Sequence, residues 1–170
     1  MKAITISQLQ LTDAHAFFAM VSDATTANAA GFDVITSLQA ATDLLRIELS
    51  QSNGLAVKYG GQTVGCVFFY PQVDQFGQPM ADRFEVGFLM HPKFSGRGIM
   101  TQGLALALQW LQRQFDVARI IANVSITNDA SKAVLLHNHF AQLGTFIAFS
   151  GDERLQFELV IVKECKKSYN

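Results

Sequence analysis

The chain has 170 residues, of which 49% are hydrophobic and 16% are charged. This length and composition argue against disorder and predict a single domain, residues 1–170, with one sizeable core. The net charge of -1 predicts no basic face, so nucleic acid is not expected as a partner. The opening "MKAITISQLQLTDAHAFF" has no signal-peptide core, and no apolar run reaches membrane length, so no membrane association is expected.

The sequence contains two cysteines, Cys66 and Cys165. Cys66 lies in an apolar run and is interpreted as a small core residue, whereas Cys165 belongs to "KECKK", residues 163–167, interpreted as a solvated tail. A disulfide between them is possible but nothing requires it, and two cysteines alone cannot build a zinc site. No His, Cys or Asp cluster has ligand spacing, so no metal is expected, and the default location is a reducing cytoplasm.

The first half of the chain predicts a strand, two helices and a hairpin. The strand covers residues 2–11, and the first helix begins at Thr12-Asp13 and continues through "AHAFFAMVS". The small, polar "DATTANAAGF" is interpreted as a loop, and apolar residues at helical spacing predict a helix within residues 33–52. The runs "LAVKY" and "TVGCVFFY" around Gly60-Gly61 predict a β-hairpin whose second strand ends at Pro71.

The second half begins with a turn-rich loop, "QVDQFGQPMAD", followed by a strand, "RFEVGFLM". A glycine turn then leads into a helix from about Thr101 to Phe115, and "ARIIANVSI" predicts the next strand. Asn128 is a good N-cap for the helix "DASKAVLLHNHF", and two strands around Gly151-Asp152 complete the pattern. Alternating strands and helices predict an α/β or α+β fold with the order β-α-α-β-β-β-α-β-α-β-β.

The glycine turn, "SGRG", has the properties of an anion site. A helix N-terminus presents backbone N–H groups without partners and the positive end of the helix dipole, which suits a diphosphate. Gly96 and Gly98 leave room for close approach, and Arg97 adds a fixed positive charge. A Walker loop is excluded because Ile99 follows Gly98, and the dinucleotide fingerprint is excluded because position 101 is threonine. A plain strand-to-helix turn without a ligand is the alternative.

The stretch "FEVGFLMHPKFSGRGIMTQGLALALQWL", followed by "IIANVSITNDASKAVLLHNHFAQLG", resembles the GNAT superfamily of N-acyltransferases. Within that superfamily, the ribosomal-protein N-terminal acetyltransferase branch looks most similar, and the resemblance is strongest over residues 84–144. It implies an α/β (α+β) GNAT fold with a mixed, mostly antiparallel sheet of about seven strands and about four flanking helices. It also implies a sheet splayed at a slot for acetyl-CoA, the expected co-substrate.

The resemblance assigns the pyrophosphate loop to residues 95–100. Ser95 departs from the family's Gln/Arg and Met100 departs from its small residue, whereas the key Gly98 is kept. The end of the preceding strand would pair with the pantetheine amides, and Asn128 and Ser131 match the family's start of the next helix. The family's Gly-Phe near that helix's end is replaced by His139-Phe140, so an altered helix end is expected. The cofactor-binding residues implied are Phe88, Leu89, Met90, Ser95, Gly96, Arg97, Gly98, Ile99, Met100, Thr101, Asn128, Ser131 and His137.

The resemblance also suggests catalytic roles. Glu85 lies on the strand beside the slot and is the first choice for the base, directly or through water; pairing with Arg83 is the alternative. The tyrosine that many family members use as acid falls at Leu135, so Ser131 is expected to hydrogen-bond the sulfur instead. His91 is a second base candidate. Family position suggests that His15, Arg46 and the Phe32 region line the acceptor pocket. The first two helices and the loop at residues 71–82 are expected to form its walls.

Two classes of function follow. The first is an acetyl-CoA-dependent N-acetyltransferase acting on a primary amine, either a protein N-terminus, a small amine or an antibiotic. The second is an acyl-CoA-binding module that acts as a sensor or binds a partner without chemistry. An ordinary α/β domain without cofactor is a third reading, and a homodimer formed by edge strands, including the two final strands, is possible.

Overall fold

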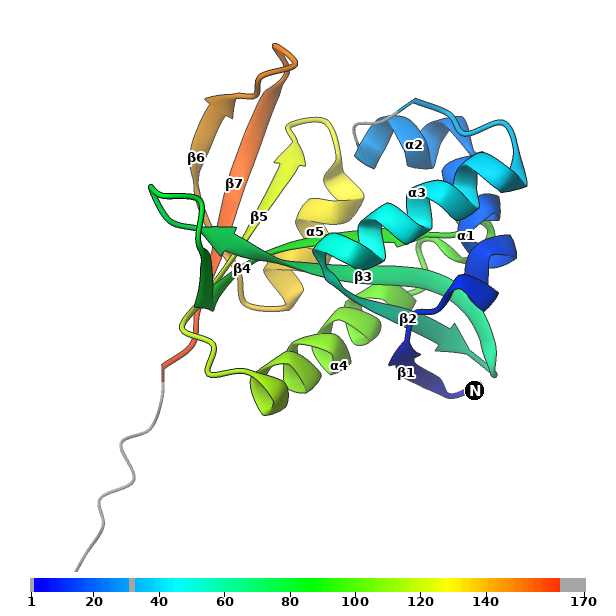
Figure 1. Ribbon diagram of the computed structural model, residues 1–170, viewed down its shortest axis with the longest axis horizontal. Coiled ribbons are helices and arrows are strands. Elements are labelled where there is room, and N and C mark those ends of the chain that lie inside the picture. The colour runs from blue at the N-terminus through cyan, green and yellow to red at the C-terminus, as the bar shows by residue number, and fades with distance from the viewer. Residues whose placement is uncertain (1, 31–32, 163–170) are drawn as a thin grey trace, which may run out of the picture.

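The computed structural model describes residues 2–30 and 33–162. Within these residues, seven strands form one sheet in the order β1-β2-β3-β4-β5-β7-β6, accompanied by five α-helices (Figure 1). The predicted mixed, mostly antiparallel seven-stranded sheet is confirmed, because only β4 and β5 pair in parallel within the described part of the chain. The elements are β1 Ile4–Gln8, η1 Leu11–Asp13, α1 Ala14–Val21, α2 Ala24–Ala30, α3 Leu38–Gln51, β2 Asn53–Tyr59, β3 Gln62–Val73, β4 Pro79–Met90, η2 Pro92–Phe94, α4 Ile99–Gln114, β5 Arg119–Ser125, α5 Asp129–His137, β6 Ala141–Ile147 and β7 Glu153–Val160.

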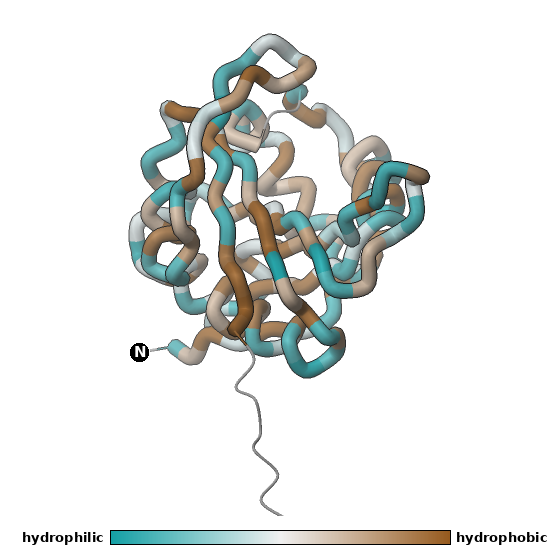
Figure 2. Tube along the Cα trace, turned by 90° about the vertical axis from the view of Figure 1, so that its left-hand side faces the viewer, coloured by the Kyte–Doolittle hydropathy of each residue, from teal (hydrophilic) through white to brown (hydrophobic). Residues whose placement is uncertain are grey.

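Helices cover both faces of the sheet and create two apolar clusters. Helices α4 and α5 pack on one face, and α1 and α3 pack on the other (Figure 1). Alternation along the strands divides the side chains: Val67 and Phe69 of β3 face α4, whereas Cys66 and Phe68 face α1 and α3. Figure 2 shows apolar stretches along the strands inside the molecule and hydrophilic residues at several outer turns. The sheet is therefore buried between two helical layers over β2 to β4.

Helix α4 begins at Ile99, two residues before the predicted start, because Gly98 serves as the N-cap with a left-handed φ of 69°. Its buried stripe includes Leu104, Leu108 and Leu111, as the sequence spacing predicts. At Gly103 an added Cβ would lie 2.6 Å from a Val57 methyl group, so this helix approaches β2 more closely than a side chain would allow. This packing fixes the start of α4 relative to the sheet.

The segment interpreted as a loop, residues 23–32, contains the helix α2, so that prediction was wrong for the described residues 24–30. The Asp23 carboxylate accepts hydrogen bonds from the backbone N–H and the hydroxyl of Thr26, and the Asp23 carbonyl accepts the Ala27 N–H. The Thr26 backbone hydrogen bond is the main cause that lowers the pKa of Asp23. An acidic N-cap followed by several alanines favours a helix, and Ala27 is fully buried. Composition alone was misleading here.

Pro71 does not end β3, which was the second wrong prediction. Pro71 pairs with Phe84, and the register shifts between Pro71 and Val73, where a missing N–H is tolerated at a bulge. The predicted loop shrinks to a tight turn in which the Asp74 carboxylate accepts the N–H groups of Phe76 and Gln78. Strands β3 and β4 therefore form one long hairpin.

Strands β4 and β5 diverge after a short paired segment. In the described part of the chain, they pair at only three positions, from Arg83 with Arg119 to Glu85 with Ile121. From Val86 onward, β4 has no partner on its β5 side, although β3 still pairs with its other edge. The predicted splay is thus present, and it leaves backbone groups of β4 facing an opening in the sheet.

The end of α5 keeps the geometry that a glycine would give, so the expected alteration is limited to side-chain identity. His139 has a left-handed φ of 65°, the Phe140 N–H donates to the Leu135 carbonyl, and the His139 N–H donates to the Leu136 carbonyl. These two bonds form a Schellman motif, with Phe140 and Leu135 in the same apolar cluster. A histidine with a left-handed φ is sterically strained, because its Cβ crowds the backbone.

Some predictions fall on residues whose structure is not described. Cys66 is fully buried, as predicted, but Cys165 and the rest of "KECKK" lie outside the described residues, as does Phe32. Strand β6 exposes Leu143 and Ile147 at the end of the sheet, and a homodimer through such strands stays a prediction. Among the helices of the described residues, none has the length and hydropathy needed to cross a bilayer.

Candidate active site

A cavity of about 570 Å³ lies where β4 separates from β5. The glycine turn, the start of α4 and one side of α5 complete its walls, and α2 contributes Thr25, Thr26 and two alanines. Every residue predicted to bind the cofactor lines this one cavity. Its volume falls within the range of about 300–1,000 Å³ typical of small-molecule sites. The structure thus brings these residues together, and their role in binding stays a prediction.

The glycine turn forms an open cradle in front of α4. Gly96 and Gly98 both have left-handed φ values, of 72° and 69°, and an added Cβ at either would meet no atom within 4 Å. No side chain caps α4, so the N–H groups of its first turn are available to a ligand. The Asn138 side-chain amide donates to the Thr101 and Val134 carbonyls, at 3.1 and 2.8 Å, and joins this turn to α5. Asn138 thus supports the cradle from the α5 side, and no side chain of the described residues covers its glycines.

The cationic side chain of the turn is folded back onto aromatic rings. The Arg97 guanidinium donates to the Tyr59 hydroxyl at 3.2 Å and lies 5.0 Å and 5.7 Å from the Tyr59 and Phe94 ring centroids. His91, the second base candidate, accepts the Lys93 N–H through Nδ1 and does not line either cavity described here. The fold therefore gives His91 a capping role in η2.

The start of α5 faces the same cavity. The Asn128 side-chain oxygen accepts the Ser131 N–H at 3.0 Å, which confirms the predicted N-cap. Ser131 lines both this cavity and a second, adjoining one. His137 lies near the other end of α5 with Nδ1 2.7 Å from the Ala133 carbonyl. Ser131 is thus at the junction between the two cavities.

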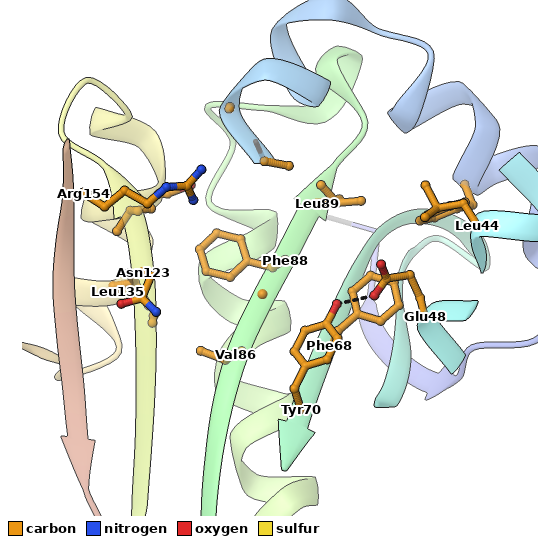
Figure 3. A pocket seen from close by; sticks show the side chains of 17 residues that line it. Leu44, Glu48, Phe68, Tyr70, Val86, Phe88, Leu89, Asn123, Leu135 and Arg154 are labelled. Atoms are coloured by element: carbon orange, nitrogen blue, oxygen red, sulfur yellow. Dashed lines mark hydrogen bonds between the residues drawn. The ribbon is translucent and has the colours of Figure 1, made fainter. Parts of the chain in front are cut away.

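The second cavity, of about 200 Å³, lies under α1, α2 and α3 (Figure 3). Its apolar wall is formed by side chains that include Phe17, Leu44, Phe68 and Leu89. It meets the larger cavity at residues that both share: Ala29, Ala30, Phe88, Leu89 and Ser131. We call the larger one the slot and the smaller one the acceptor-side cavity.

Helices α1 and α3, the first two helices expected at the acceptor pocket, do line the acceptor-side cavity, but His15 and Arg46 do not. His15 is exposed, Arg46 pairs with Asp43 at 2.6 Å, and neither lines a cavity described here. The region 71–82 forms the distal end of the β3–β4 hairpin and contributes no lining residue either. Phe17 and Glu48, each two residues further along α1 and α3, line the acceptor-side cavity instead, because residues two apart in a helix are separated by about half a turn and face opposite sides.

The acceptor-side cavity contains a carboxylate held by a tyrosine. The Tyr70 hydroxyl on β3 donates a short hydrogen bond to Oε2 of Glu48 on α3 (Figure 3). Burial and then this hydrogen bond raise the pKa of Tyr70 far above its ordinary value. Tyr70 therefore stays protonated and keeps donating to Glu48 at physiological pH.

Glu85 lies at the base of the splay rather than in a cavity wall. Asn123 on β5 donates to Glu85 Oε1 at 3.0 Å, and Gln156 on β7 donates to Asn123 Oδ1 at 3.2 Å. Glu85 is also the register partner of Tyr70. The alternative pairing with Arg83 is not among the ion pairs of the described residues. A polar row thus crosses the sheet from Tyr70 to Gln156, and its members Tyr70 and Asn123 line the acceptor-side cavity.

Sequence reasoning missed four polar residues of this region: Glu48, Tyr70, Asn123 and Arg154. Tyr70 and Asn123 occur within strands and Glu48 within a helix, so each looked like an ordinary polar residue of its element. Asn123 and Arg154 project to the same face of the sheet. Alternation along β5 and β7 shows this only when the two strands are known to be neighbours, which the sequence alone did not reveal. Within the described residues, no group of three or more His, Cys, Asp or Glu side chains gathers as a metal site.

A sheet opened between two parallel strands, with a glycine-started helix beside the opening, is the arrangement of an acyltransferase fold. The model of the acetyltransferase (GNAT) domain matches residues 3–141, so the chain belongs to the GNAT acetyltransferase family and is an acyltransferase. The family prediction is confirmed. No curated protein matches this sequence.

Solved structures share the fold over nearly the whole chain. The chain is similar to a GNAT-family acetyltransferase from Bacillus anthracis, with a TM-score of 0.80, 14% identity, and coverage of 94% of this chain and 96% of that chain. It is similar to RimL, a ribosomal L7/L12 α-N-protein acetyltransferase in complex with coenzyme A, with a TM-score of 0.77, 17% identity, and coverage of 95% and 96%. AAC(6')-Ib, in complex with ribostamycin and coenzyme A, has a TM-score of 0.75, 13% identity, and coverage of 93% of each chain. At these identities the likeness concerns the fold.

Proposed function

We propose that this protein is an acetyl-CoA-dependent N-acetyltransferase that acts on a primary amine, either a protein N-terminus or a small molecule. One observation carries the proposal: the unpaired edge of β4 and the uncapped start of α4 line a single slot of about 570 Å³. An edge with free amide and carbonyl groups suits the pantetheine chain, and uncapped helix amides suit a diphosphate. Coenzyme A contains both groups in one molecule. RimL and AAC(6')-Ib, with the same fold, are each described in complex with coenzyme A.

The residues present fit this co-substrate. The diphosphate would be held by backbone N–H groups of the turn from Ser95 to Thr101, where no Cβ at Gly96 or Gly98 intrudes. The pantetheine amides would pair with backbone groups of β4 from Phe88 to Met90. Arg97 would have to leave the Tyr59 ring to reach a phosphate oxygen, which an exposed side chain can do.

The proposed reaction is a direct transfer. The amine nitrogen forms a bond to the acetyl carbonyl carbon, and the bond from that carbon to sulfur breaks. An amine bound in its protonated form first gives up one proton, because only the neutral nitrogen can attack. The nitrogen then loses a second proton to the base and the departing sulfur gains one, so the products are an amide, a thiol and one released proton. Ser131 is the proposed donor to the sulfur, since it lies where the two cavities meet.

Two carboxylates are candidates for the base. Glu85, the residue expected from the sequence, is close to Asn123 and Tyr70 but would need a bridging water, because it does not line the acceptor-side cavity. Glu48 lines that cavity directly. We propose Glu85 as the base acting through water, with Glu48 as the group that attracts the protonated amine.

The test combines binding and turnover. Calorimetry with acetyl-CoA should show binding, and thiol release should appear with some members of a panel of amines. The two carboxamide variants then separate the roles: Glu85→Gln should lower kcat, whereas Glu48→Gln should mainly raise KM for the amine. Binding without thiol release would replace this proposal by an acyl-CoA-binding module, and absence of binding would refute both.

A further inference from the structure

The acceptor-side cavity carries opposite charges on opposite walls. Figure 3 shows Glu48 of α3 on one side, Arg154 of β7 on the other, and Phe88 of β4 between them. At about 200 Å³, this cavity is smaller than the range of about 300–1,000 Å³ typical of sites for drug-sized ligands. Only a compact group, or the end of a larger molecule, can enter it. The charges of Glu48 and Arg154 therefore bear on which chemical groups an acceptor can carry next to its reacting amine.

Arg154 has unused hydrogen-bonding capacity. Its Nε is buried and has no hydrogen-bond partner among the described residues, and it is the one buried side-chain nitrogen or oxygen in that part of the chain with this property. None of the ion pairs within the described residues includes Arg154, whereas Arg119, on the same face of the sheet, pairs with Glu158 of β7. A buried donor on a permanently charged group is unfavourable unless an acceptor arrives.

The position of Arg154 is fixed by strand register. Arg154 pairs with Ser125 in the β5–β7 ladder, and Gln156 pairs with Asn123, so both β7 side chains project to the face that carries the polar row. The neighbouring Leu155 projects to the opposite face and is buried in the α4 cluster. The guanidinium reaches across β5 to the cavity (Figure 3). The paired strands β5 and β7 thus fix the Arg154 guanidinium in the wall of the acceptor-side cavity.

A carboxylate is the ligand group that this geometry favours. Guanidinium donors match the two oxygens of a carboxylate, and hydrogen bonds between charged partners are the stronger class. The Glu48 wall favours the ammonium form of the amine before reaction, so the two walls together fit an amine and a carboxylate in one molecule. A polycationic acceptor would instead place like charge against Arg154.

Resting on the proposed function, we propose that the acceptor carries a carboxylate near its reacting amine and that Arg154 is the specificity-determining residue that binds it. Two sources share this chemistry: a free amino acid, whose carboxylate is its own, and a protein N-terminus with an acidic second residue. Both present a carboxylate a few bonds from a primary amine. The acetyl transfer itself is the step written above.

The experiment compares matched acceptors and matched variants. The panel contains each of the common amino acids with its amide, peptides that begin Ala-Asp or Ala-Asn, and the aminoglycoside ribostamycin. For the parent protein, kcat/KM should favour the carboxylate member of at least one pair by about 10- to 100-fold, the worth of one charge-assisted hydrogen bond. Amino acids responding alone identify the first source, and Ala-Asp peptides responding alone identify the second.

Arginine variants assign the preference to one side chain. Arg154→Met should remove that preference by raising KM for the carboxylate acceptor, and Arg154→Lys should restore part of it, because lysine keeps the charge without the fork. Arg113→Met, an exposed arginine of α4 that lines neither cavity, is the control. Acetyl-CoA binding, measured by calorimetry, should be the same in all three variants.

Three results would overturn this inference while leaving the acetyltransferase proposal intact. They are equal rates for acids and amides, a preference for ribostamycin, and an unchanged preference in Arg154→Met. Acetyl-CoA binding with no turnover of any carboxylate acceptor would overturn it as well. Failure of the parent protein to bind acetyl-CoA would instead refute the proposed function, and the separate binding measurement distinguishes the two results.

Discussion

The glycine cradle gives a prediction in which strain and ligand binding can be separated. Gly98 and Gly61 share two properties: both have left-handed φ values, of 69° and 85°, and an added Cβ at either meets no atom within 4 Å. Gly98 lines the slot, whereas Gly61 lies in the β2–β3 turn and lines neither cavity. Gly98→Ala and Gly61→Ala therefore impose the same kind of backbone strain at two different places.

The magnitudes follow from these properties. An L-residue in the left-handed region costs about 1–2 kcal/mol, and because no clash adds to it, each variant should lose about that much stability. For a chain of this size, such a loss lowers Tm by about 2–8 °C. A methyl group on the cradle should also displace the diphosphate from at least one backbone N–H. One charge-assisted hydrogen bond is worth about 1.5–3 kcal/mol, or about 10- to 100-fold in Kd.

Calorimetry with acetyl-CoA, together with thermal unfolding of both variants, tests this reasoning. We expect similar falls in Tm, with weaker acetyl-CoA binding in Gly98→Ala alone. If the two variants bind acetyl-CoA as tightly as the parent, the turn does not hold the diphosphate. If both bind it equally weakly, the loss comes from general destabilisation, and the reasoning also fails.

Three further predictions concern stability. His139→Gly should raise the free energy of unfolding by about 0.5–1 kcal/mol, because glycine avoids the left-handed strain but costs some chain entropy; urea unfolding with no rise in midpoint would contradict this. Asn138→Ala should cost about 1–3 kcal/mol and weaken acetyl-CoA binding, because the Thr101 and Val134 carbonyls lose their donor; unchanged binding would show that the cradle needs no such support. The raised pKa of Tyr70 means that above pH about 10 the unfolded chain releases this proton while the folded chain keeps it, so stability falls by up to about 1.4 kcal/mol per pH unit. Tyr70→Phe should remove that part of the alkaline loss, and an identical alkaline slope in urea titrations of both proteins would refute it.

Features that depend on a few neighbouring residues could be predicted from the sequence. The glycine turn needs only glycines before an apolar helix, and the Asn128 N-cap needs only the residues up to Ser131. Local signals also failed where two of them conflicted. At residues 23–30, the small polar composition concealed an Asp23 cap and a run of alanines, and at Pro71 a bulge allowed the strand to continue.

The acceptor side depended on tertiary structure. Glu48, Tyr70, Glu85 and Arg154 come from four elements separated by up to about a hundred residues, and only the strand order places them around one region. Strand β7 lies between β5 and β6 in the sheet. Arg154 therefore lines a cavity whose other strand residues come from β3, β4 and β5, all earlier in the chain. Sequence determined most of the helices and strands and the turn that begins α4, because those depend on local sterics and hydrogen bonding. The position of a charge in the acceptor-side cavity was decided by strand pairing between distant segments, and the chain has no local pattern that encodes it.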